Sequence, residues 1–231
     1  MGRKPIIVSM TSWPKRIGNV ATVVKSLLDQ SLPPDIIEIN LSKDEFPNRE
    51  EDFPEDLKEV IKHEPRIDIE WVDGNDGVFK KIIPTIKKHY GEDYYLLSVD
   101  DDWVYSNDYI EVMYDTISQV ECDTLCLCEY FVIGSRMIYD SRIFEPDFWE
   151  KLTPEVVSTR IDDDYIVRYL SYKNAIMASW GEPTGERYFK EFNPVFSNAQ
   201  NDGGGYKEED LARAKEIIGA ITFEKRQNRE D

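Results

Sequence analysis

The chain has 231 residues, of which 41% are hydrophobic and 12% aromatic. A chain of this length can form one sizeable hydrophobic core but is short for two separate domains. Its formal charge of -18 argues against a nucleic-acid or anionic-membrane partner, because a surplus of Lys and Arg holds such partners. No run approaches the roughly 18 apolar residues of a membrane span, and the N-terminal stretch is unlike a signal peptide. We therefore expect a cytoplasmic protein without an integral membrane segment.

The cysteines do not indicate a disulfide framework, because Cys122, Cys126 and Cys128 are odd in number and close together. The last two alternate with leucines in a strand-like run, where small buried residues are the simplest interpretation. A zinc site is disfavoured because only three thiols are present and both histidines, His63 and His89, are far away in the sequence.

The first predicted elements form a β-α-β unit. Residues 5–10 have the apolar composition of a strand, and the apolar residues of 20–28 recur with helical spacing. Residues 36–41 form a second predicted strand. We expect the two strands to be parallel neighbours joined by a right-handed crossover.

The alternation of helix and strand continues through the first half of the chain. A helix is predicted near 57–61, a strand over 67–72, a helix over 80–88 despite Pro84, and a strand over 94–99. Four strands alternating with helices are typical of an open, mostly parallel sheet. The predicted fold class is α/β: one Rossmann-like domain whose central sheet is flanked by helices.

The second half is less regular. Residues 125–133 and 135–139 are predicted to be paired strands. A helix is expected over 160–175, long loops over 180–206, and a last helix over 207–223.

The most informative feature is the acid triplet, Asp100, Asp101 and Asp102, directly after a predicted buried strand. α/β proteins bind ligands beyond the carboxyl ends of such strands, and adjacent carboxylates repel one another unless a cation or strong donors offset the repulsion. The alternate residues Asp100 and Asp102 can reach one Mn²⁺ or Mg²⁺ ion. The remaining coordination positions of that ion suit the oxygens of a diphosphate. The alternative is a solvated acidic turn.

The turn after the first strand is expected at the same edge of the sheet. Its hydroxyls, on Thr11 and Ser12, could hold a nucleotide, and Arg16 could meet a phosphate. The alternative is an ordinary helix N-terminus with Ser12 as the N-cap.

A second group, Asp73 with Lys80 and Lys81, also follows a predicted strand at this edge. A carboxylate can accept hydrogen bonds from a ribose or a base, and a lysine can neutralise phosphate. Taken singly, each residue could simply be solvated.

Later acids offer a general base. Asp163 or Asp164 could take the proton from an attacking hydroxyl, although acids in a first helical turn are also favoured by the helix dipole. The glycine-rich loop at 201–206 could close over a substrate or serve as a plain linker. The chain has no P-loop and no GxGxxG after the first strand, which disfavours an ATPase or an NAD-dependent enzyme.

The order of these features resembles bacterial GT-A-fold glycosyltransferases, specifically small family-2-like members. The likeness lies in segments 7–16, 26–30, 81–84 and 99–102. It covers about the first 110 residues well and the remainder loosely. It implies a nucleotide-sugar-binding half at 1–110 and an acceptor-side half at 111–231 of one continuous domain.

The resemblance also implies roles for individual residues. Asp100 and Asp102 match the DxD positions that hold Mn²⁺ or Mg²⁺, and Asp163 or Asp164 matches the base of inverting members. Residues implied to border the donor are Thr11, Ser12, Arg16, Asp73, Lys81, Asp100 and Asp101. One departure is that neither histidine follows the triplet, so the later histidine ligand of many relatives is missing; Asp202 is a substitute that nothing in the sequence places there.

The functional expectation is transfer of a sugar from a nucleoside diphosphate sugar, with a UDP-sugar favoured, to a glycan or other hydroxyl acceptor. Metal dependence, inversion and a place in cell-surface polysaccharide synthesis belong to that expectation. One alternative is a nucleotidyltransferase acting on a sugar phosphate. The other is a non-catalytic carbohydrate-binding or scaffold protein that uses the aromatic residues Trp103, Tyr105, Trp149, Trp180 and Tyr206.

Overall fold

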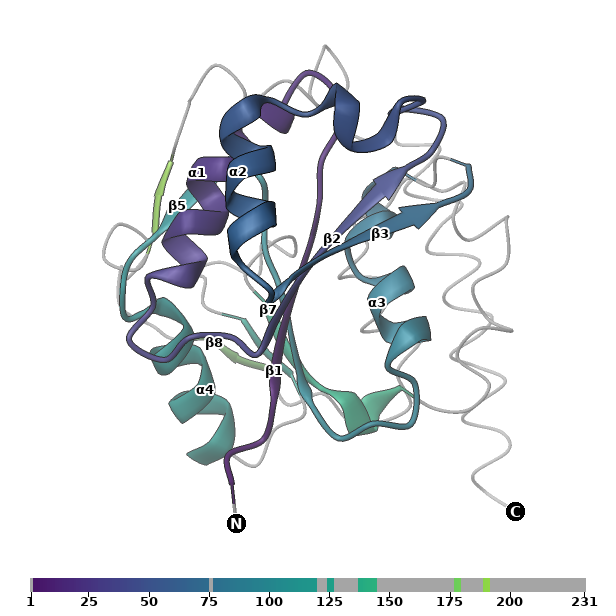
Figure 1. Cartoon of the computed structure of the whole chain (residues 1–231). Coiled ribbons are helices and arrows are strands. Elements are labelled where there is room, and N and C mark those ends of the chain that lie inside the picture. Colours follow the sequence, from purple (N-terminus) through teal and green to yellow (C-terminus); the bar gives the residue numbers. More distant parts are fainter. Residues whose placement is uncertain are drawn as a thin grey trace, which may run out of the picture.

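A seven-stranded sheet in the order β3-β2-β1-β4-β7-β6-β8 forms the centre of the protein (Figure 1). The computed structural model describes residues 2–74, 77–119, 124–126, 137–144, 177–179 and 189–191. The strands of this sheet are β1 (Ile6–Thr11), β2 (Ile36–Ser42), β3 (Ile67–Val72), β4 (Tyr95–Ser98), β6 (Thr124–Cys126), β7 (Met137–Asp140) and β8 (Met177–Ser179). A two-stranded sheet joins β5 (Trp103–Tyr105) to β9 (Phe189–Glu191).

Helices lie on both faces of the sheet (Figure 1). The α-helices are α1 (Ile17–Leu28), α2 (Glu55–His63), α3 (Ile83–Lys88) and α4 (Tyr109–Gln119). Short 3-10 helices are η1 (Arg49–Asp52), η2 (Gly77–Lys81) and η3 (Ser141–Ile143). Within the described part of the chain, no helix combines the length and the apolar character that a membrane crossing requires.

The predicted α/β class and mostly parallel sheet are confirmed. β1 pairs in parallel with both β2 and β4, and β2 pairs in parallel with β3. In the second half β7 is antiparallel to β4 and to β6, and Leu125 lies opposite Ile138 as expected for the predicted pair. Parallel pairing brings the carboxyl ends of β1 and β4 to the same edge of the sheet.

Two predictions about secondary structure are wrong. The helix expected over 80–88 is divided, because η2 ends at Lys81 and α3 begins at Ile83. Pro84 lies in the first turn of α3, where its missing N–H has no partner to lose. The loop expected over 180–206 contains β9, and the predicted helices over 160–175 and 207–223 lie outside the described residues.

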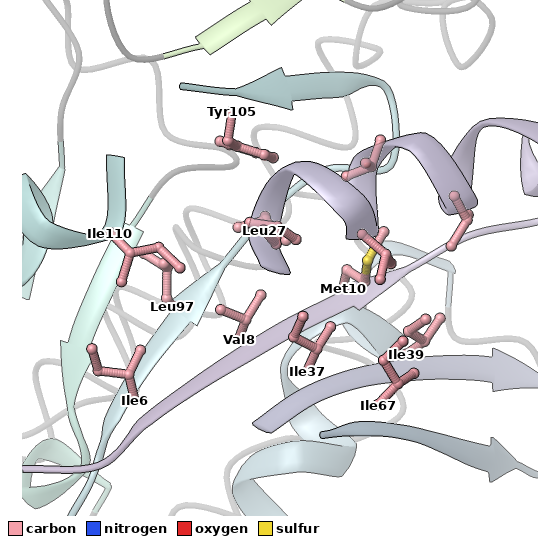
Figure 2. Packing of buried hydrophobic residues seen from close by; sticks show 14 of the residues in the cluster. Ile6, Val8, Met10, Leu27, Ile37, Ile39, Ile67, Leu97, Tyr105 and Ile110 are labelled. Atoms are coloured by element: carbon pink, nitrogen blue, oxygen red, sulfur yellow. The ribbon is translucent and has the colours of Figure 1, made fainter. Parts of the chain in front are cut away.

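One face of the sheet carries the hydrophobic core. Alternate residues of β1, such as Val8 and Met10, are fully buried with Ile37 and Ile39 of β2 beneath Leu27 of α1 (Figure 2). Residues of α4 and an aromatic group from the α2 side complete the same cluster. Period-two alternation places these apolar side chains on one face and leaves the other face for the residues between them.

The opposite face is also buried, and it carries polar residues beside the apolar Ile7 and Leu96. Ser9, Glu38, Asn40 and Ser98 have no solvent exposure. His89, which follows α3, places Nε2 2.8 Å from Glu38 Oε1, so the α3 side of the sheet is joined by polar contacts. Buried polar groups of this kind need partners, and residues 81–89 supply them for Ser9, Asn40 and Glu38.

Candidate functional site

The candidate site lies where the ends of β1 and β4 meet. The acid triplet follows β4, and the turn after β1 reaches it. Ser12 Oγ donates a hydrogen bond to Asp101 Oδ2 at 2.6 Å, and Arg16 Nη1 lies 3.2 Å from Asp101 Oδ1. Arg16 Nη2 forms an ion pair with Asp102 Oδ2. Segments about 90 residues apart therefore share one charged cluster.

The triplet is not a solvated acidic turn. Asp101 and Asp102 are each only 4% exposed, and Arg16 is 7% exposed. Burial raises the pKa of Asp101 above its ordinary value, while Arg16 and the hydrogen bond from Ser12 oppose that rise. Burial removes these carboxylates from water, which costs free energy. The Arg16 guanidinium offsets part of this desolvation penalty, which a turn exposed to solvent would not have.

The alternative role of Ser12 as an N-cap is wrong. α1 begins at Ile17 and its N-cap position is Arg16, which makes no side-chain capping bond. Thr11 Oγ1 donates to the backbone oxygen of Asn40 at 2.7 Å and so ties β1 to β2. Of the two hydroxyls, Ser12 is the one that contacts the acid triplet.

Lys81 supplies a second cation beside the triplet. Its Nζ lies 3.4 Å from Oδ1 of Asp100, whose side chain is 30% exposed. The backbone N–H of Asp100 donates a hydrogen bond to the hydroxyl oxygen of Tyr105 at 2.9 Å. Among the described residues, the three carboxylates of the triplet thus contact two cations, Arg16 and Lys81.

A buried hydrogen-bond network holds the backbone of Lys81. Ser9 Oγ donates to the carbonyl oxygen of Lys81 and lies 2.7 Å from Thr85 Oγ1. Asn40 Nδ2 lies 3.0 Å from both hydroxyl oxygens and 3.3 Å from the same carbonyl oxygen. This network was not predicted from the sequence, although the polar residues at every second position of β2 are a signal for a buried polar face.

The predicted group of Asp73, Lys80 and Lys81 is divided. The Asp73 side chain is 90% exposed and pairs with Lys43 at 2.7 Å, whereas Lys80 forms an ion pair with Glu45. A cavity of about 440 Å³ lies between β3 and α3. Its lining is Glu70, Trp71, Val72, Asp73, Phe79, Lys80, Ile83, Pro84, Lys87 and Lys88, and it includes none of the acid triplet.

Tyr105 does not fit the expected aromatic surface for carbohydrate. It is 3% exposed and its ring lies 4.7 Å from that of Tyr109. Three of the other aromatic residues in that expectation, Trp149, Trp180 and Tyr206, lie outside the described residues. Tyr105 is therefore a core residue that supports the backbone of the triplet.

The remaining expectations concern a base and a metal ion. Asp163, Asp164 and Asp202 lie outside the described residues. Among the residues that are described, no three or more His, Cys, Asp or Glu side chains are arranged to hold a metal ion. Carboxylate oxygens are ligands that a hard cation takes, so an ion on Asp100 and Asp102 would need its other ligands from water and a diphosphate.

Comparisons with known proteins find similarity only at the level of structure. No protein-family model matches the chain, and no curated protein matches it. A structure of S. aureus TarS 1–349 in complex with UDP superposes with a TM-score of 0.64 at 12% identity, over 94% of this chain and 65% of that one. The TarS 1–349 complex with UDP-GlcNAc gives a TM-score of 0.62 at 14% identity, over 94% and 66%.

A further structure, of S. aureus TarS itself, has a TM-score of 0.56 at 12% identity and covers 93% of this chain. The chain spans 65% of the length of the TarS 1–349 complex with UDP and 43% of the length of that further structure. At such low identity, the superpositions establish a shared architecture only. The strand order places the acid triplet at the carboxyl ends of the parallel strands, as expected. The chain therefore has the GT-A-type α/β fold that its sequence resemblance implies.

Proposed function

We propose that this protein is a glycosyltransferase that moves a sugar from a nucleoside diphosphate sugar, with a UDP-sugar favoured, to a hydroxyl acceptor such as a glycan. The observation that carries the proposal is the buried contact of Arg16 with Asp101 and Asp102 beside the Lys81–Asp100 pair. The fold adds support, because TarS structures of the same architecture contain UDP and UDP-GlcNAc.

The charge pattern suits a diphosphate bound together with a cation. Asp100 and Asp102 would hold Mn²⁺ or Mg²⁺, with Asp102 as the principal ligand. When bound, that ion would act as a Lewis acid and neutralise charge on the departing diphosphate. Arg16 and Lys81 would bind phosphate oxygens, which a guanidinium does in a bidentate manner.

The nucleoside would lie along the same edge of the sheet. Thr11, Ser12 and Asp101 would border the ribose, and the exposed carboxylate of Asp73 would accept hydrogen bonds from base or ribose. These donor contacts would orient the anomeric carbon for attack.

The acceptor would be activated by a carboxylate from the second half of the chain. Asp163 or Asp164 would take the proton from the attacking hydroxyl. A base on the side opposite the leaving diphosphate implies inversion at the anomeric carbon. A cytoplasmic location and a role in cell-surface polysaccharide synthesis complete the proposal.

The test is release of UDP from UDP-GlcNAc. The full chain is incubated with UDP-GlcNAc and Mn²⁺, with and without a panel of hydroxyl acceptors, and products are separated by ion-exchange chromatography. We expect UDP to form, and Asp102→Asn to reduce the rate by at least about 100-fold, as loss of one electrostatic stabiliser does in other enzymes. Asp108→Asn, which changes a carboxylate bound by Ser106 at the start of α4, is the matched control and should keep the rate.

A parallel incubation, with a nucleoside triphosphate and a sugar phosphate in place of UDP-GlcNAc, separates the proposal from a nucleotidyltransferase. That alternative requires pyrophosphate to form from a nucleoside triphosphate and a sugar phosphate, with no UDP from UDP-GlcNAc. Pyrophosphate formation that depends on Asp102 would replace the proposal.

A further inference from the structure

The most unusual feature of the site is that both terminal nitrogens of the Arg16 guanidinium contact acids of the triplet. Nη1 lies 3.2 Å from Asp101 Oδ1, and Nη2 pairs with Asp102 Oδ2. The side chain is buried, and within the described part of the chain its Nε has no hydrogen-bond partner. A guanidinium is best satisfied when its planar fork meets two oxygens of one anion, and here the fork is divided between two carboxylates.

This arrangement conflicts with a cation on Asp102. A divalent ion and the Arg16 guanidinium would compete for the same carboxylate, and two cations within a few ångströms repel each other. An incoming diphosphate removes the conflict, because it offers the guanidinium two oxygens on one group. A diphosphate and a divalent ion that arrive together also bring nearly offsetting charges into the buried cluster.

We propose that Arg16 changes partners when the donor binds. Without donor it is the counter-ion of Asp101 and Asp102; with donor its guanidinium binds the diphosphate and leaves Asp102 to the metal ion. This inference rests on the proposed function, which it deepens by assigning to one residue the dependence of metal binding on nucleotide.

The neighbouring contacts allow the exchange without leaving Asp101 unpartnered. Asp101 keeps the hydrogen bond from Ser12 Oγ at 2.6 Å when the guanidinium departs. Asp100 keeps Lys81 at 3.4 Å. Asp101 and Asp102 both lose the cation, but Asp102 has no other described side-chain partner, and it is the carboxylate that the metal ion would then take.

The consequence is reciprocal coupling. A diphosphate that removes Arg16 from Asp102 raises the affinity for Mn²⁺, and by thermodynamic necessity Mn²⁺ raises the affinity for the diphosphate by the same factor. The coupling should require the phosphates, so uridine should not produce it.

The experiment measures Mn²⁺ binding to the full chain by isothermal titration calorimetry, alone and in the presence of UDP or uridine. For the wild type we expect UDP to tighten Mn²⁺ binding on the order of 10-fold or more. For Arg16→Gln, which keeps an N–H donor but removes the charge, we expect opposite changes. Mn²⁺ alone should bind more tightly than to the wild type, UDP more weakly, and the coupling factor should fall clearly below that of the wild type, to what the direct contact between Mn²⁺ and the diphosphate supplies.

Arg142→Gln is the matched control. Arg142 makes a bidentate ion pair with buried Asp140, at 2.8 and 2.6 Å. Asp140 pairs with Tyr95 at the start of β4, whereas the acid triplet follows the end of that strand. Arg142→Gln breaks another Arg–Asp pair, one with an exposed arginine and a buried carboxylate, and should leave both affinities and the coupling factor at wild-type values.

Each outcome is decisive for one proposal. If Arg16→Gln binds Mn²⁺ alone no better than the wild type while the coupling is retained, the exchange is refuted although UDP binding by the wild type sustains the proposed function. If the wild type binds no UDP with or without Mn²⁺, the proposed function itself fails. Should Arg16→Gln not fold, Arg16→Lys, which keeps the charge without the fork, should weaken UDP binding and reduce the coupling factor, and an unchanged factor would overturn the exchange.

Discussion

The buried network around Lys81 gives a stability prediction that can be worked from its contacts. Thr85→Val keeps the shape of the side chain but removes Oγ1, which lies 2.7 Å from Ser9 Oγ and 3.0 Å from Asn40 Nδ2. All three side chains are fully buried, so water cannot replace the lost hydroxyl.

The expected cost follows from what the two partners keep. A buried polar group left without a partner costs about 1–3 kcal/mol. Ser9 and Asn40 both still contact the carbonyl oxygen of Lys81, so each loses one bond rather than all of them. We therefore expect Thr85→Val to lower the free energy of unfolding by about 2 kcal/mol.

The assay is urea unfolding followed by tryptophan fluorescence, with Thr116→Val as the control. Thr116 Oγ1 donates to the Val112 carbonyl oxygen at 2.7 Å from a half-buried position on α4, where water can take its place. We expect the control to change the free energy of unfolding by less than about 1 kcal/mol. An effect of Thr85→Val no larger than that of Thr116→Val, at equal denaturant dependence, would refute the reasoning.

Three further perturbations test the fold. The pKa of Asp140 is below its ordinary value. Burial raises this pKa, but the hydrogen bonds from Arg142 and Lys4 lower it by more. Its charge therefore contributes stability above about pH 4, and the stability lost in Asp140→Asn should shrink as pH falls below that value in urea titrations at pH 7 and pH 3. Glu38→Ala should lower the free energy of unfolding by about 1–3 kcal/mol, since it removes the buried partner of His89 Nε2 and one of the carboxylates beside Lys88, and an unchanged free energy would contradict this. Leu27→Ala should cost about 2–5 kcal/mol by leaving a cavity beneath α1, which thermal unfolding would detect.

The N-terminal half of the fold could be predicted because its strands are apolar runs bounded by polar turns. The run before Asp100 placed the acid triplet at the end of a strand, and β-α-β connectivity placed Arg16 at the same edge. The structure confirms that edge, and Ser12 and Arg16 reach the triplet there.

The direction of individual side chains could not be predicted. Lys80 and Lys81 are adjacent, yet one pairs with Glu45 and the other with Asp100, because they lie on a 3-10 helix whose extent depends on tertiary contacts. The three-residue strands β5 and β9 are too short to show periodicity, so only their pairing identifies them. The pairing of Arg16 with Asp102 likewise depends on where α1 begins. The local sequence suggested Ser12 as the N-cap of this helix, whereas the N-cap is Arg16.

The central claim is that the acid triplet is part of a metal-assisted site for a nucleoside diphosphate. The most direct measurement is calorimetric titration of UDP, GDP and CMP into the wild type and Asp102→Asn, with and without saturating Mn²⁺. The account predicts that UDP binds the wild type in the presence of Mn²⁺ and at least about tenfold more weakly when either Mn²⁺ or the Asp102 carboxylate is removed. Binding of none of the three nucleotides, or equal binding to both proteins, would contradict it.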